Sequence, residues 1–327
     1  MFKPFSPDIS IVIPVFNAEA YIARCASSLF SQTKDNLEFI FIDDCSADDS
    51  ISIIRETMSA FPSVDDHVKI VKNPRNMGPA ATRQNGFQKA SGKYIAMIDA
   101  DDFIAEDMYA QMYDMACKGD YDIVMCDINV IEEDDDYRSG MKWDNDMPDN
   151  GMALVSMLLR RHQLPVDVLW NKIFKRELIV NELVETPRRF LSEDFYNLIQ
   201  WYSLAKSVGY VDLPLYNYRV HSGSLSSDIN ALECRFGRLE HLKDAKRFLH
   251  CRSLYNSLFD DVLWCHKAEE IRIESIGTDD FKRIWSLSFK PMVKMIWERQ
   301  EFSLKVKLIE TIKRVGHLIS TISHRHG

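Results

Sequence analysis

The chain has 327 residues, of which 46% are hydrophobic, and this length allows one sizeable core with room for an additional module. Its formal net charge of −9 at pH 7 argues against nucleic acid as a partner, because nucleic-acid-binding proteins present a basic face. The seven cysteines include no Cys-x-x-Cys pair, so the sequence predicts reduced thiols and neither a zinc site nor a disulfide framework.

Strand-like and helix-like patterns alternate along the first seventy residues. Residues 8–15 are rich in β-branched side chains, which is typical of a strand buried on both faces. Residues 18–31 carry apolar side chains three or four positions apart, as on a helix packed against a sheet. A second strand is predicted over 37–42, a second helix after Ser50, and a third strand over 68–71. This order predicts a parallel sheet flanked by helices.

The next apolar strand, residues 93–98, ends in three carboxylates, Asp99, Asp101 and Asp102. Like charges repel, so a cation is a natural reason to gather them. Carboxylates suit Mg²⁺ or Mn²⁺, which usually bind together with substrate phosphates. A solvated acidic turn is the alternative. Because ligands of such sheets sit at the carboxyl ends of the strands, the pattern predicts a phosphate and metal site there.

Four segments in this region occur in the order and spacing of one known family. They closely resemble the motifs of the family 2 inverting glycosyltransferases, and they are residues 9–17, 43–46, 76–86 and 99–102. The resemblance continues to about residue 228 through three more segments, residues 169–176, 192–194 and 218–224.

The family resemblance implies a GT-A fold, which is an α/β fold with a mixed, mainly parallel sheet flanked by helices. The catalytic domain would comprise residues 1–228. Its nucleotide-sugar part would span about 8–110 and its acceptor part about 111–228. Residues 229–327 would form an α-helical C-terminal appendage, because their apolar side chains show helical spacing.

The resemblance also implies the residues of the nucleotide-sugar and metal sites. Asp44 would accept a hydrogen bond from a uracil ring, and Arg83 would face the base or the phosphates. The nucleotide-sugar site would further include Pro14, Val15, Phe16, Asp43, Asn76, Asp99 and Ala100. The metal, Mn²⁺ or Mg²⁺, would be held by Asp101, Asp102 and His221.

On the acceptor side, the resemblance assigns the catalytic base to Asp194. Glu193 beside it is free to orient the acceptor or the structure; acids at a helix start are also favoured by the helix dipole alone. Trp170 could stack on a sugar and Lys172 could meet an anionic acceptor or phosphate, but core packing and surface charge explain these two residues equally well. His221 could equally be a structural loop residue.

The implied enzyme transfers a hexosyl or N-acetylhexosaminyl group from a nucleotide donor, a UDP-sugar, to a hydroxyl of a glycan or lipid-linked glycan. Synthesis of a cell-surface polysaccharide, such as capsule or lipopolysaccharide, is the expected setting. One base and no second nucleophilic carboxylate in the motifs favour a single displacement that inverts the anomeric carbon.

Two other classes of protein use similar features. A nucleotidyltransferase that makes activated sugars would carry a glycine-rich phosphate loop near its first strand, and residues 16–19 do not form one. A non-catalytic sugar-nucleotide-binding scaffold would keep the fold, but every acidic motif is present here. A Rossmann dehydrogenase is disfavoured because no G-x-G-x-x-G sequence occurs.

The tail, residues 303–322, combines a helical apolar stripe with several lysines and arginines. Such a segment would either lie on an anionic membrane surface or pack on the catalytic domain or on a second subunit in a homodimer. Neither a signal peptide nor a membrane-spanning apolar run is visible. We therefore expect a cytoplasmic protein, peripheral on the inner face of the membrane if the tail binds lipid.

Overall fold

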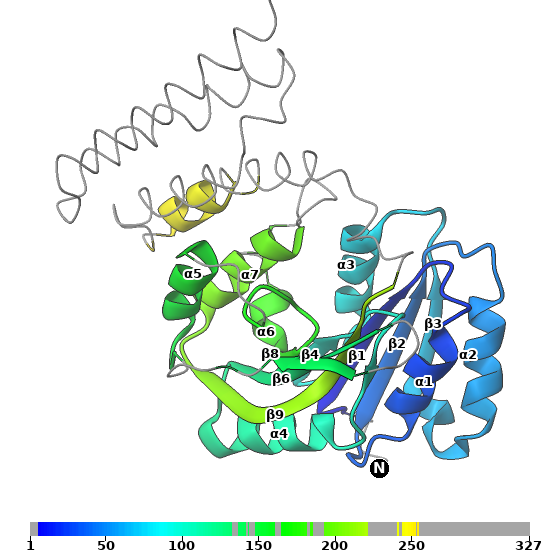
Figure 1. The fold of residues 1–327 in the computed structure, drawn as a ribbon. Helices are drawn as coiled ribbons and strands as arrows, with labels where there is room; N and C mark the ends of the chain where they lie inside the picture. Colours follow the sequence, from blue (N-terminus) through cyan, green and yellow to red (C-terminus); the bar gives the residue numbers. More distant parts are fainter. Residues whose placement is uncertain are drawn as a thin grey trace, which may run out of the picture.

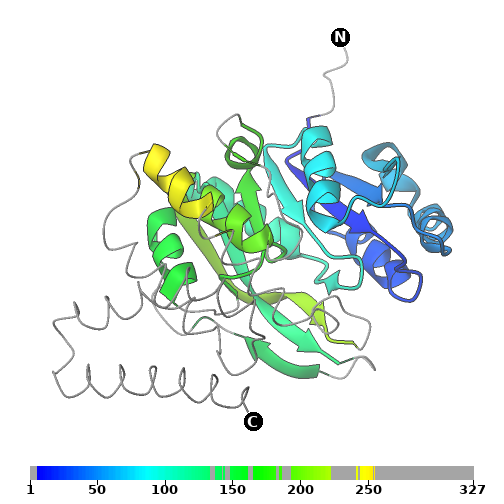
Figure 2. The same cartoon turned by 90° about the horizontal axis from the view of Figure 1, so that it is seen from above.

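The computed structural model of the protein contains a nine-stranded sheet with helices on both faces (Figures 1 and 2). The strand order is β3-β2-β1-β4-β8-β6-β9-β5, and β7 pairs with β6 beside this path. The structure describes residues 6–132, 137–141, 143, 148–160, 165–181, 184–185, 193–221, 241, 244–252 and 254.

The N-terminal half of the sheet is parallel. Its strands are β1 (Ile9–Val15), β2 (Leu37–Asp43), β3 (Val68–Lys72) and β4 (Tyr94–Met97). The segments between these strands contain α1 (Ile22–Phe30), α2 (Ser50–Ser59), the short 3₁₀ helix η1 (Pro62–His67) and α3 (Pro79–Lys89). These elements confirm the alternation that the sequence predicts.

The second half of the sheet mixes strand directions. β8 (Lys172–Lys175) lies antiparallel between β4 and β6 (Ile123–Ile131), and β9 (Val208–Arg219) runs parallel to β6. The short β5 (Phe103–Ile104) and β7 (Tyr137–Met141) pair antiparallel with β9 and β6.

Alternating side chains of each strand face two separate cores. One core joins Val12 and Ile95 to α3, α5 (Gly151–Arg160), α6 (Arg176–Ile179) and α7 (Glu193–Leu204). The other joins Ile11 and Tyr94 to α1, α2 and α4 (Met108–Gly119). Because helices cover both faces of the sheet, the central strands need apolar side chains at nearly every position.

A further helix spans residues 244–251 and is drawn in yellow (Figure 1). Its Ala245, Phe248 and Leu249 are fully buried in the core that contains α5 and α7. This part of the predicted helical appendage therefore packs on the core that contains α5 and α7. The basic tail, residues 303–322, lies outside the described residues. None of the helices described is long and apolar enough to cross a bilayer.

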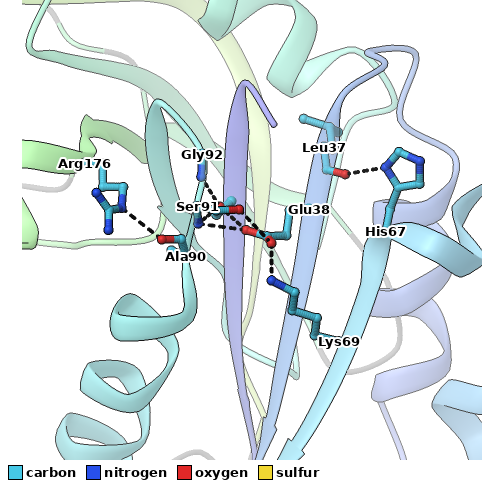
Figure 3. A network of polar contacts seen from close by, with 9 residues as sticks. Leu37, Glu38, His67, Lys69, Ala90, Ser91, Gly92 and Arg176 are labelled. Atoms are coloured by element: carbon cyan, nitrogen blue, oxygen red, sulfur yellow. Dashed lines mark hydrogen bonds and ion pairs between the residues drawn. The ribbon is translucent and has the colours of Figure 1, made fainter. Parts of the chain in front are cut away.

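A buried carboxylate fixes the start of β4 (Figure 3). Glu38 on β2 accepts hydrogen bonds from Ser10 Oγ, from the backbone and hydroxyl of Ser91, and from Lys69 Nζ at 2.5 Å. On the other side of this turn, Arg176 Nε donates to the carbonyl of Ala90 at 2.9 Å. The N–H of Gly92 also donates to Ser10 Oγ of β1 at 2.8 Å, so the turn between α3 and β4 is tied to β1, β2 and α6. These contacts set the position of β4 and of the acidic loop, residues 99–102, that follows it.

Candidate active site

Arg83 connects the end of β4 with the start of α7. Its guanidinium Nη2 lies 3.0 Å from Asp99 Oδ1, and its Nη1 lies 3.0 Å from both Glu193 Oε1 and Asp194 Oδ1. Asp99 follows β4, whereas Glu193 and Asp194 occupy the first turn of α7. Residues more than 90 positions apart therefore form one ion cluster at the carboxyl edge of the sheet, where the sequence predicts the site.

The two neighbouring acids of α7 differ in exposure. The Asp194 side chain is 31% exposed and the Glu193 side chain 9%. Burial, together with the charge of Asp194, raises the pKa of Glu193 to about 7 against the opposing effect of Arg83. Burial also raises the pKa of Asp194. Burial alone would lower the pKa of Arg83. The neighbouring Asp194 and Asp99 carboxylates raise this pKa by more than burial lowers it, so the guanidinium stays charged.

Asp101 and His221 form a second polar pair beside this cluster. The distance from Asp101 Oδ2 to His221 Nε2 is 2.9 Å, and the Asp101 side chain is 33% exposed. Burial and the charge of Asp99 raise the pKa of Asp101. The described residues contain no group of three or more His, Cys, Asp or Glu side chains arranged to hold a metal ion.

Asp102 does not join this pair, contrary to its expected role as a metal ligand. Its Oδ2 accepts a hydrogen bond from Tyr216 Oη at 2.6 Å, and its Oδ1 accepts one from the backbone N–H of Arg219 at 2.7 Å. The side chain is 1% exposed. Asp102 is thus used to fasten the acidic loop to β9, and burial raises its pKa well above the ordinary value.

Asp44 lies at the predicted base site and binds the loop before α3. Its Oδ1 accepts hydrogen bonds from Asn73 Nδ2 at 2.7 Å and from the N–H of Met77 at 2.8 Å. Its Oδ2 accepts one from the N–H of Gly78 at 2.8 Å. Gly78 has φ of 80°, a left-handed conformation that glycine adopts without steric cost. The same N–H of Gly78 also donates to Asn76 Oδ1 at 3.2 Å.

The other residues of the predicted nucleotide-sugar site lie at the ends of β1 and β2 and in the loop after β4. The carbonyl of Val15 accepts the N–H of Asp44 at 2.8 Å, and Asp43 accepts the N–H of Ser46 at 2.7 Å. Pro14 is half-buried, whereas Phe16 is 50% exposed. Ala100 is buried in the loop after β4.

Trp170 and Lys172 are buried and do not offer the surfaces expected of acceptor-binding residues. The Trp170 ring stacks on Tyr216 at 4.1 Å and on Tyr218 at 5.3 Å between ring centroids, and the residue is 6% exposed. Lys172 is fully buried, and its Nζ donates to oxygens of Pro165, Val168 and Asn171. The burial of Trp170 agrees with the core-packing alternative. Lys172 does not agree with the surface-charge alternative, because its amine is fully buried.

Comparison with known proteins identifies the family. Residues 10–181, more than half of the chain, match the family described as Glycosyl transferase family 2. The chain belongs to this family. The putative glycosyltransferase EpsH of Bacillus subtilis is 32% identical over 67% of this chain. That alignment covers 63% of EpsH, less than two thirds of its length.

Solved structures show the same fold. S. aureus TarS 1-349 in complex with UDP-GlcNAc has a TM-score of 0.64 at 16% identity, covering 88% of this chain and 79% of that one. The mannosyltransferase PcManGT from Pyrobaculum calidifontis, in complex with GDP-Man and Mn²⁺, has a TM-score of 0.55 at 15% identity, covering 96% and 81%. The predicted GT-A fold is confirmed.

Sequence reasoning on this family 2 chain did not single out three residues that organise the site. Asn73 links Asp44 to Thr82 of α3, Arg219 holds the backbone carbonyl of Asp101, and Tyr21 packs on His221. Arg219 lies within a motif that the resemblance includes, so a signal was present. No local sequence pattern marks Asn73 or Tyr21 as a site residue, because only tertiary contacts bring them to the site.

Proposed function

We propose that this chain transfers a hexosyl or N-acetylhexosaminyl group from a UDP-sugar to a hydroxyl of a glycan or lipid-linked glycan acceptor, inverting the anomeric carbon. The observation that carries the proposal is the Arg83 ion cluster. It joins the donor-side Asp99 to the predicted base Asp194 at the carboxyl edge of the sheet. Similarity to a UDP-GlcNAc complex and to a GDP-Man complex supports a nucleotide-sugar donor.

The hydrogen bonds of Asp44 support uridine as the base. A carboxylate has about four acceptor positions, two on each oxygen. Two bonds occupy Oδ1 and one occupies Oδ2, so a single position remains on Oδ2. Uracil presents one N–H on its pairing edge and fits this position. Guanine presents adjacent N–H groups that would need two acceptors.

Asp101 and His221 are the residues that would hold the divalent metal. A carboxylate oxygen and an imidazole nitrogen 2.9 Å apart are suitable donors, and Mg²⁺ or Mn²⁺ commonly takes few protein ligands and completes its shell with phosphate oxygens. The Nε2 of His221 is the nitrogen that faces Asp101, so it is the one that would bind the ion. When bound, the ion would neutralise negative charge on the diphosphate leaving group.

Asp194 is the better candidate for the base. It is more exposed than Glu193, so an acceptor hydroxyl can reach its carboxylate, and its raised pKa favours uptake of the acceptor proton. The more buried Glu193 shares the same Arg83 nitrogen and holds the guanidinium in place. One base is enough for a single displacement, in which the acceptor hydroxyl attacks one face of the anomeric carbon and the diphosphate leaves from the opposite face.

The setting that we propose is synthesis of a cell-surface polysaccharide at the cytoplasmic face of the membrane. The acceptor would be a glycan or a lipid-linked glycan, and the basic tail would bring the enzyme to an anionic surface or to a second subunit. Co-sedimentation with anionic vesicles, comparing the full chain with a version ending near Glu301, tests the tail. Equal partition of both proteins would contradict the membrane role.

Binding of nucleotides tests the donor assignment. We expect calorimetry to show UDP binding that Mn²⁺ strengthens and chelation weakens, with GDP binding more weakly than UDP. A thermal-shift screen of UDP-glucose, UDP-galactose, and their N-acetylated and uronate forms would then identify the sugar. Equal affinity for UDP with and without metal would contradict the role of Asp101, and tighter binding of GDP would contradict the role of Asp44.

A further inference from the structure

The ring of His221 lacks the usual second hydrogen bond of a metal-binding histidine. Its Nε2 faces Asp101 Oδ2 at 2.9 Å, but its Nδ1 is buried with no hydrogen-bond partner in the part of the chain that the structure describes. Metal-binding histidines normally donate from the second nitrogen to a carbonyl or carboxylate, which fixes the orientation of the ring. Another contact must therefore limit rotation of this imidazole.

Tyr21 makes that contact. Its ring centroid lies 4.5 Å from the centroid of the His221 ring, with 38° between the two planes. The guanidinium of Arg219 lies 5.5 Å from the Tyr21 ring centroid, and Arg219 Nε donates to the carbonyl of Asp101 at 3.2 Å. Tyr21 is thus packed against both the predicted ligand and the arginine that fixes the backbone of the other ligand.

The position of Tyr21 is itself fixed by the start of α1. The N–H of Tyr21 donates to the carbonyl of Ala18 at 2.9 Å. The N–H of Ala18 in turn donates to Ser50 Oγ at 2.8 Å, and the N–H of Glu19 donates to Asp48 Oδ2 at 2.9 Å. Two contacts, one with the first residue of α2 and one with Asp48 just before it, therefore hold the backbone of the segment that carries Tyr21.

We propose that Tyr21 is a positioning residue for the metal site: its ring packs on the His221 imidazole and holds it in the orientation that binds the ion. The inference rests on the proposed function, because it assumes that Asp101 and His221 hold the metal. It concerns the ring of Tyr21 and not the hydroxyl, since the ring is what contacts His221. Tyr21→Phe should therefore behave like the wild type, and Tyr21→Ala should not.

The test measures UDP affinity by calorimetry with Mn²⁺ and with EDTA, and Mn²⁺ affinity by electron paramagnetic resonance in the presence of UDP. The ratio of the two UDP affinities defines the metal gain. We expect Tyr21→Ala to reduce the metal gain and the Mn²⁺ affinity by about tenfold, the lower end of the range for residues that orient a metal ligand. UDP affinity in EDTA should stay at the wild-type value.

A double-mutant cycle separates positioning from a general structural effect. In a His221→Ala background, Tyr21→Ala should cause no further loss of the metal gain. Tyr113→Ala is the matched control, because Tyr113 in α4 also packs on an aromatic ring, that of Tyr94, at 6.0 Å. It should leave the metal gain unchanged. If Tyr21→Ala does not fold, Tyr21→Leu replaces it, since leucine keeps bulk but has no ring face.

Three results would overturn the inference: equal loss of UDP affinity with and without metal in Tyr21→Ala, a further loss in the His221→Ala background, or a loss in Tyr21→Phe. Failure of the proposed function looks different. In that case the wild type shows no metal gain, or His221→Ala leaves the gain intact.

Discussion

Arg83 Nη1 lies 3.0 Å from Asp194 Oδ1, so the predicted base is paired with a cation that stays charged. The same nitrogen lies 3.0 Å from Glu193 Oε1. One guanidinium nitrogen thus holds two adjacent carboxylates at the start of α7. The chemistry of the site depends on which of them takes the acceptor proton, and the different exposure of the two side chains favours Asp194.

Asp194→Asn should lower turnover by about a hundredfold to ten-thousandfold, the usual range for removal of a general base. An amide still accepts a hydrogen bond from Arg83 but does not take the acceptor proton. UDP affinity should remain near the wild-type value, because the change does not touch the metal pair. Glu193→Gln is the matched control and should retain most of the turnover. A larger loss in Glu193→Gln than in Asp194→Asn would reassign the base to Glu193.

Arg83→Met should lower the free energy of unfolding by about 3 kcal/mol, because it leaves Glu193 in a buried position without its cation. The value lies at the low end for broken buried pairs, since Asp99 and Asp194 are each 31% exposed and water can solvate them. Urea unfolding measures the loss. The double variant Arg83→Met with Glu193→Gln should recover part of the lost free energy of unfolding. If the double variant is only as stable as Arg83→Met, Glu193 is not the residue that the single change leaves unpaired.

The parallel half of the fold could be predicted because each strand carries a local signal. Residues 9–15 and 37–43 are apolar at nearly every position, as strands covered on both faces require. β5 has two residues and β8 has four, and their strand structure depends on pairing with β9, β4 and β6. No local pattern indicates such pairings, so the mixed half was predicted only through the family.

The candidate site could also be predicted only in part, because its contacts join residues far apart in the sequence. The sequence places carboxylates at strand ends, but it does not show which partners their oxygens take. Asp101 and Asp102 are adjacent and chemically alike. The first faces His221, whereas the second is buried and accepts hydrogen bonds from Tyr216 and from the backbone N–H of Arg219, both more than 110 residues away.

Glu38→Gln should lower the free energy of unfolding at pH 7 by about 2 kcal/mol, because it removes hydrogen bonds to a buried charged group. Burial raises the pKa of Glu38, but the hydrogen bonds from Lys69 and Ser10 outweigh it and lower the pKa below the ordinary value. A lowered carboxyl pKa stabilises the fold above the unfolded pKa of about 4.3, and this stabilisation is lost as the pH falls through the folded value.

Urea unfolding of wild type and Glu38→Gln at pH 7 and near pH 3 checks this expectation. The difference between the two proteins should shrink at the lower pH, where wild-type Glu38 gains a proton. Lys69→Met is the control for the exposed partner, whose side chain is 50% exposed, and it should cost less than about 1 kcal/mol. A difference that is independent of pH would show that the charge of Glu38 does not stabilise the fold.

Lys172→Met should remove part of the increase in wild-type stability between pH 7 and pH 9. Burial lowers the pKa of Lys172 to about 7, whereas an unfolded lysine titrates near 10.4. Between these values the unfolded chain binds more protons, so the free energy of unfolding rises with pH, by at most about 1.4 kcal/mol per pH unit for this group. The three oxygens around Nζ favour the charged amine and oppose this effect.

Urea unfolding at several pH values measures the slope for wild type, Lys172→Met and the control Lys89→Met, which replaces an exposed lysine of α3. We expect a smaller slope only in Lys172→Met, and equal slopes in all three proteins would mean that the three oxygens keep the buried amine charged.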